Sequence, residues 1–93
     1  MAKPPLDPPI ADQAPTAGEL TDYDREHLVI YLRLLDADAE NADWAEVARA
    51  VLLINPSDAP ERARRAWESH LARARWMIEH GYRYFVWGRV RSL

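Results

Sequence analysis

The chain has 93 residues, no cysteine and a formal net charge of −3, from 15 Asp and Glu against 12 Lys and Arg. This length allows one small domain. The lack of cysteine excludes disulfides, thiol catalysis and cysteine-ligated zinc. No apolar run reaches the roughly 18 residues that a membrane span needs. We therefore expect a cytoplasmic protein without a membrane partner.

Residues 1–19 hold five of the seven prolines, and their apolar residues follow no helical or strand period. Such a segment cannot bury enough apolar surface to offset the entropy of ordering its backbone, so we expect a disordered tail. No apolar stretch follows Lys3, which argues against a signal peptide. We expect the folded domain to span residues 20–87, followed by a frayed C-terminus at 88–93.

The charges are unevenly distributed along the domain. Residues 21–60 hold nine acids and three arginines, whereas residues 61–93 hold eight arginines and three acids. The two halves either screen each other within one fold or present surfaces of opposite sign to partners.

The first predicted helix begins at Thr21, because Thr21–Asp24 has the pattern of a capping box with Asp in place of Glu. Four apolar residues then share the spacing of one helical face: Leu28, Tyr31, Leu32 and Leu35. Ile30 and Leu34 lie beside this face and make the apolar arc wider than one neighbouring helix would cover. We expect the helix to end within residues 36–41.

The second predicted helix begins after Asp43, a strong N-cap residue, with Glu46 three residues later. It is expected to end near Ile54, because Pro56 disfavours helical geometry at Asn55. Five residues form its predicted inner face: Trp44, Val47, Ala48, Val51 and Leu52.

Residues 55–59 are expected to form the turn to a third helix, with Asp58 as its N-cap and Pro60 in its first turn. This helix should run to His80, with Gly81 at its C-terminal stop. Its predicted inner face consists of Ala63, Ala66, Trp67, His70, Leu71, Ala74, Met77 and Ile78. The second and third predicted helices have the outline of a helix-turn-helix. The expected fold is therefore a small all-α domain with an extended turn.

Trp76 is expected to face outward, opposite the inner face of the third helix. Large outward aromatics are enriched at binding surfaces. The alternative is that residues 82–87, an aromatic arm or short strand, fold over it. The same question of exposure applies to Ile30 and Leu34.

Catalysis has little support in the sequence. His27, His70 and His80 fall on separate faces or turns without the spacing of a metal-ligand pair, and the isolated glycines form no phosphate-binding loop. His70 lies on an apolar face, where a hydrogen-bonded core histidine is the commoner role. We expect no enzyme activity, no cofactor, no metal and no small-molecule substrate.

The arginines of the third helix allow two interpretations. Arg62, Arg64 and Arg65 lie in its first turns, where a recognition helix meets base edges and phosphates. Alternatively they belong to a solvated face with acidic partners four residues away, as the pairs Arg64–Glu68 and Arg75–Glu79 would have.

Three motifs in order, Tyr31–Asp36, Ala42–Ala48 and Gly81–Arg83, resemble the FseA/QseM family of regulators of integrative and conjugative element transfer in proteobacteria. The resemblance covers Leu20–Tyr84 and implies a helix-turn-helix with an extended turn. Activators of that family carry a further N-terminal domain and a basic DNA-binding surface, whereas antiactivators are the bare domain with an acidic surface.

The acidic net charge, the tail before Leu20 and the presence of Ala45 where DNA-binding members tend to have arginine are similar to the antiactivators. The resemblance therefore implies an antiactivator that binds the N-terminal domain of an FseA-like transcriptional activator, with DNA not expected as a partner. The candidate partner-binding residues are Ile30, Leu34, Trp76, Tyr82, Tyr84 and Trp87. The alternative is a DNA-binding transcriptional regulator, acting as a dimer, whose contacts are Arg62, Arg64, Arg65 and Arg73.

Overall fold

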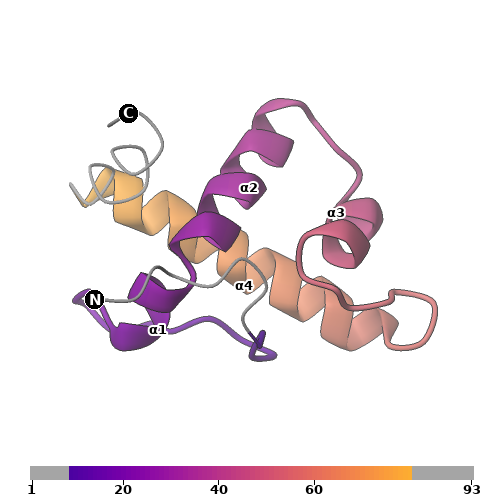
Figure 1. Cartoon of the computed structure of the whole chain (residues 1–93), viewed down its shortest axis with the longest axis horizontal. Coiled ribbons are helices and arrows are strands. Elements are labelled where there is room, and N and C mark those ends of the chain that lie inside the picture. Colours follow the sequence, from indigo (N-terminus) through magenta and orange to yellow (C-terminus); the bar gives the residue numbers. More distant parts are fainter. Residues whose placement is uncertain (1–8, 81–93) are drawn as a thin grey trace.

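The computed structural model describes residues 9–80, which contain four helices and no strand: α1 (Asp22–Glu26), α2 (Leu28–Ala39), α3 (Trp44–Ala50) and α4 (Pro60–Glu79). The long helix α4 runs across the molecule, with α2 crossing it and α3 lying beside its first half (Figure 1). For the residues described, this confirms the predicted small all-α, helix-turn-helix-like fold. None of these helices is long and apolar enough to cross a membrane.

The single helix predicted from Thr21 is divided into α1 and α2 at His27, whose φ of −112° and ψ of 21° interrupt the helical backbone. The predicted capping box is confirmed, since the Thr21 side chain accepts from the Asp24 amide and the Asp24 carboxylate accepts from the Thr21 amide at 2.9 Å. The break at His27 separates the start of the predicted helix from its apolar part. Asp24 on α1 can therefore contact other residues than those that the apolar face of α2 packs against.

Ile30 and Leu34 are core residues, each with only 1% of its surface exposed. The expectation that they face outward as partner contacts is thus corrected. Leu32 and Leu35, expected on the inner face, are only partly buried and pack against the margin of the core. Ile30 and Leu34 thus belong to the core that α2 forms with α4 and the residues around α3.

The predicted N-cap of α3 is confirmed, because the Asp43 carboxylate accepts from two amides of the first turn. The helix ends at Ala50, four residues before the predicted end. Leu53 then adopts a positive φ of 59° and is 63% exposed, whereas Leu52 and Ile54 on either side are buried. This extended connection secures its apolar residues in the core without continuing the helix.

Pro60 lies in the first turn of α4, as predicted, but the helix begins at this residue and its N-cap is Ala59, which makes no side-chain capping bond. The prediction of Asp58 as the cap is therefore wrong. Asn55 organises the turn instead, because its side chain accepts from the Ser57 amide at 2.9 Å and its carbonyl accepts from the Asp58 amide at 3.2 Å. Such an Asx turn satisfies the backbone before the helix begins.

The inner face of α4 is confirmed by full burial of four residues with no exposed surface: Ala63, Ala66, Ala74 and Met77. Three of the four are alanines, which allow the backbone of α4 to approach its neighbours closely. Trp67 and Ile78 are only partly buried. The expected C-terminal stop at Gly81 lies outside the described residues.

Residues 9–20 form a segment that we call the N-terminal strap, which runs from below the middle of α4 to α1 (Figure 1). Ala14 in this strap is 4% exposed, and its amide donates to the Ser69 hydroxyl of α4 at 3.0 Å. The expectation of a disordered tail therefore does not hold for residues 9–19. Polar side chains of the helices bind strap backbone groups, so the strap needs little apolar surface of its own.

Candidate nucleic-acid interface

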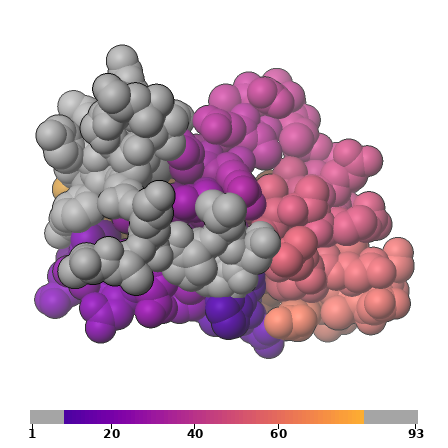
Figure 2. Space-filling model, in the orientation of Figure 1, coloured from indigo at the N-terminus to yellow at the C-terminus, as the bar shows by residue number. Residues whose placement is uncertain are grey.

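The first two turns of α4 carry three exposed arginines, Arg62, Arg64 and Arg65, which we call the arginine face. They lie at the end of the molecule formed by α3, the connecting turn and the start of α4, where the magenta-to-orange colours gather in Figure 2. A helix that follows α3 through a turn and presents cations from its N-terminal half has the geometry of a recognition helix.

Arg64 is oriented by two tryptophans. Its guanidinium carbon lies 5.0 Å from the ring centroid of Trp44 on α3 and 4.9 Å from that of Trp67 on α4. The predicted ion pair with Glu68 is confirmed at 3.4 Å, in a setting where both side chains are about half exposed. Cation–π contacts of this kind fix the direction of an arginine while leaving its edge open to solvent.

The other two arginines of the face differ in their surroundings. Arg62 forms an ion pair with Asp12 of the strap. Arg65 is exposed and makes no ion pair with any residue in the 9–80 range. A shallow groove of about 460 Å³ runs beside Arg64 and Arg65. Its lining consists of Trp44, Pro60, Glu61, Arg64, Arg65 and Glu68.

Arg73, two turns further along α4, has a structural position. Its side chain is 4% exposed, which corrects its prediction as an outward DNA contact. The guanidinium donates to both carboxylate oxygens of Asp24, at 3.1 Å from Nε and 2.7 Å from Nη2. It also donates to two strap carbonyls, those of Ala17 at 2.7 Å and Glu19 at 2.9 Å. Arg73 thus joins α4, α1 and the strap.

Asp24 is fully buried and is the acceptor at the centre of this network. Burial by itself raises the pKa of its carboxyl. Hydrogen bonds from Arg73, Thr21 and Tyr31 outweigh burial, so the pKa lies below its usual value. The same burial and the adjacent carboxylate raise the pKa of the Tyr31 phenol, which remains a neutral donor. The Asp24–Arg73 pair is accordingly a charged pair whose polar atoms are satisfied.

His70 is the hydrogen-bonded core histidine that the sequence predicts, with no exposed surface. Its Nδ1 lies 2.7 Å from the carbonyl oxygen of Ala66, and its Nε2 lies 2.6 Å from the hydroxyl of Tyr23. A neutral ring that donates from Nδ1 and accepts at Nε2 satisfies both bonds. Burial, the largest cause, lowers the pKa of the imidazole. Among residues 9–80, no three His, Asp or Glu side chains gather as a metal site.

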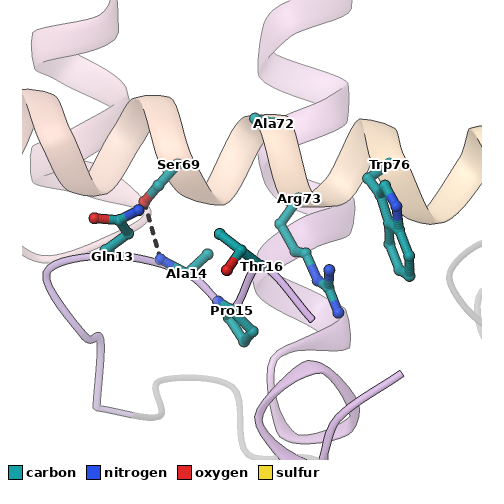
Figure 3. A pocket seen from close by; sticks show the side chains of 8 residues that line it. All are labelled: Gln13, Ala14, Pro15, Thr16, Ser69, Ala72, Arg73 and Trp76. Atoms are coloured by element: carbon teal, nitrogen blue, oxygen red, sulfur yellow. Dashed lines mark hydrogen bonds between the residues drawn. The ribbon is translucent and has the colours of Figure 1, made fainter. Parts of the chain in front are cut away.

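Trp76 is partly buried, in contrast to its predicted outward position. The guanidinium carbon of Arg73 lies 3.9 Å from its ring centroid, and the His80 ring stacks at 4.6 Å. Figure 3 shows Arg73 and Trp76 on the side of α4 that faces the strap, at a pocket of about 350 Å³. Three further residues of the predicted partner-binding set lie outside the described residues: Tyr82, Tyr84 and Trp87.

The structure therefore does not bring the site residues predicted from the sequence together at one site. Ile30, Leu34 and Arg73 belong to the interior, and Arg62 and Arg64 remain at the surface as predicted. The sequence did not reveal that Asp24 is the partner of Arg73. The two residues are 49 positions apart, and a role as capping residue was sufficient to explain Asp24. The strap was missed because most of its hydrogen bonds to the helices use its backbone atoms, which leave no side-chain pattern.

Residues 7–86 match the family model described as "T6SS, Transcription factor, DNA binding domain". The chain belongs to this family. The match spans all four helices, so the family assignment applies to the fold that carries the arginine face, and it confirms the predicted role in transcription regulation. The match names a regulator-type domain and not the narrower FseA/QseM group, so that resemblance stays a prediction. No curated protein matches the chain.

Proposed function

We propose that the protein is a DNA-binding domain of a transcriptional regulator, and that the first half of α4 enters the major groove of DNA. The observation that carries this proposal is the arginine face on the second helix of a helix-turn-helix, in a chain whose family is described as a DNA-binding domain. The sequence alone favours the antiactivator when its acidic net charge is given more weight than the position of the arginines on the third predicted helix.

The chemistry of the arginine face suits this role. An arginine can make two parallel hydrogen bonds to O6 and N7 of guanine. Arg64 suits such a contact best, because Trp44 and Trp67 fix its direction before binding and reduce the entropy lost on binding. Arg62 and Arg65 are neighbours on a different side of α4 from Arg64, and they suit contacts with backbone phosphates, which position the helix without reading sequence.

The acidic balance of the chain limits affinity rather than excluding binding. Phosphate neutralisation supplies most of the salt-dependent affinity for DNA, and three exposed arginines make few such contacts. A single domain of this size seldom binds specific DNA tightly. We therefore propose that it acts as a dimer or together with another DNA-binding unit.

The test is binding of the purified chain to a labelled duplex from upstream of its own coding sequence, followed by fluorescence anisotropy as salt is varied. Arg65→Ala should weaken binding about fivefold or more and reduce the salt slope by about one. The matched control is Arg25→Ala, which removes an exposed arginine that pairs with Asp22 on α1, away from the face. Lack of binding at low salt would overturn the proposal, as would equal losses in the two variants.

A second candidate function is the antiactivator role, which the acidic net charge of −3 favours. In that role the chain would bind the N-terminal domain of an FseA-like activator. Its partner-binding surface would centre on Trp76, together with Tyr82, Tyr84 and Trp87. Mixing the chain with that domain distinguishes the roles: a complex that survives Arg65→Ala and is lost in Trp76→Ala supports the antiactivator.

A further inference from the structure

The N-terminal strap is fixed to the helices on both sides of Asp12. On one side, the Ala11 amide donates to the Tyr23 hydroxyl at 3.0 Å, and the Pro9 carbonyl lies 2.8 Å from Nε2 of His27. On the other side, the Ala14 amide donates to the Ser69 hydroxyl of α4 at 3.0 Å (Figure 3). Asp12 is therefore held next to the first turns of α4 by bonds that do not involve its own side chain.

The Asp12 carboxylate pairs with Nε of Arg62, in the first turn of α4. Figure 2 shows the indigo strap residues beside the orange residues of α4, so the two segments meet at the surface. Both side chains are about half exposed, at 55% and 47%, and solvent reaches the pair. A carboxylate and a phosphate both accept bonds from guanidinium with the same geometry. Asp12 thus occupies Arg62 in the way that a DNA phosphate would.

We infer that Asp12 is an intramolecular competitor of the DNA backbone for Arg62, so that the strap lowers the affinity of the arginine face for DNA. This inference rests on the proposed DNA-binding function and adds a regulatory element to it. Because the strap is tethered to α4, the carboxylate is present at a high effective concentration whenever DNA is absent. Because the pair is exposed, it is weak enough for DNA to displace.

Asp12 differs in this respect from Glu19, the other acid of the strap. Glu19 has the same charge and an exposed side chain, and within residues 9–80 that side chain makes no ion pair. Only its backbone carbonyl takes part in holding the strap, through Arg73. Glu19→Gln therefore removes one negative charge from the strap without releasing an arginine, and it is the matched control for Asp12→Asn.

The experiment measures affinity of the full chain for a mixed-sequence DNA duplex at low salt, for wild type, Asp12→Asn, Glu19→Gln, Arg62→Ala and the double variant Asp12→Asn with Arg62→Ala. Asp12→Asn should bind about two- to fivefold more tightly than wild type. Glu19→Gln should stay close to wild type, and Asp12→Asn should bring no gain when Arg62 is absent. Circular dichroism checks that each variant is folded.

Each other outcome contradicts the inference. If wild type binds DNA and Asp12→Asn binds equally well, the competition is absent while the proposed function stands. If Asp12→Asn and Glu19→Gln improve binding alike, or if the gain persists without Arg62, net charge is responsible rather than occupation of an arginine. If no variant binds, including Asp12→Asn, both the inference and the proposed function fail.

Discussion

Arg64 and Arg73 lie nine residues apart on α4, yet their surroundings differ. Arg73 is buried and donates four hydrogen bonds, two of them to a buried carboxylate. Arg64 is half exposed, is oriented by aromatic rings and pairs with a solvent-exposed glutamate. The second half of α4 thus uses arginine to hold the domain together, whereas the first half keeps arginine available to a partner.

The two environments show that an arginine's role depends on what covers it. A separation of nine residues, about two and a half turns, places Arg64 and Arg73 on opposite flanks of the alanine-rich inner face of α4. The strap and α1 bury Arg73, whereas nearer the start of α4 the strap leaves Arg62 about half exposed beside Asp12. Long-range covering by a segment 50 or more residues away decides which arginines remain free to meet DNA.

Removal of the charge from the buried arginine should have the largest effect. Arg73→Met should lower the free energy of unfolding by about 3–5 kcal/mol, because Asp24 would stay buried without its partner. Arg75→Met is the matched control, since its pair with Asp38 is exposed and should contribute less than about 1 kcal/mol. Urea denaturation measures both, and equal losses would mean that burial does not distinguish Arg73 from an exposed arginine of the same helix.

A smaller effect should appear as the pH dependence of stability. Burial lowers the pKa of His70 from 6.5. As the pH falls below 6.5, the unfolded chain therefore takes up a proton that the folded chain excludes, and the free energy of unfolding decreases. This loss stops below the folded pKa. Asp24, whose pKa lies below 3.8, adds a separate loss as the pH falls below that value.

Two variants isolate the His70 contribution in denaturation curves between about pH 8 and pH 5. His70→Gln should reduce the decrease in stability on acidification. His80→Gln, at the exposed end of α4, should leave it in place. The ionisable groups that face His70 are Tyr23, Tyr31, His27 and Asp24. An unchanged pH dependence in His70→Gln would contradict a neutral core histidine.

The smallest expected effect concerns Leu53, in the connection that leads to the arginine face. Its positive φ of 59° strains a residue with a branched side chain, and 63% exposure means that the side chain gains little from burial. Leu53→Gly should raise or leave unchanged the free energy of unfolding, within about 1 kcal/mol, because relief of strain is partly offset by the flexibility of glycine in the unfolded chain. Leu53→Val, which tolerates this backbone poorly, should be less stable than wild type; thermal melts that rank the variants otherwise would contradict the strain.

The helices and their alanine-rich core were predictable from the sequence because they depend on local spacing and capping. Asp43 and Pro60 mark real helix starts, and the Thr21–Asp24 capping box is present. The exposed arginines were also visible, since Arg62, Arg64 and Arg65 fall in the first turns of α4 and off its predicted inner face. These features need no knowledge of what lies opposite them.

The remaining features depend on contacts between distant segments, which a single sequence does not encode as a pattern. Ile30 and Leu34 were placed outside because the number of neighbours around α2 was unknown. The α3 helix ends before the predicted residue because burial of Leu52 and Ile54, on either side of Leu53, outweighs helix propensity. The strap could not be predicted because proline-rich composition describes an isolated segment, not one whose carbonyls meet a buried guanidinium.

Arg73 binds the strap through main-chain oxygens of residues 17 and 19, which every amino acid possesses. The side chains at these two positions take no part in these bonds, so substitutions there should leave the attachment of the strap intact. Relatives of this chain should accordingly have arginine and aspartate at positions 73 and 24, whereas almost any residue should be found at positions 17 and 19.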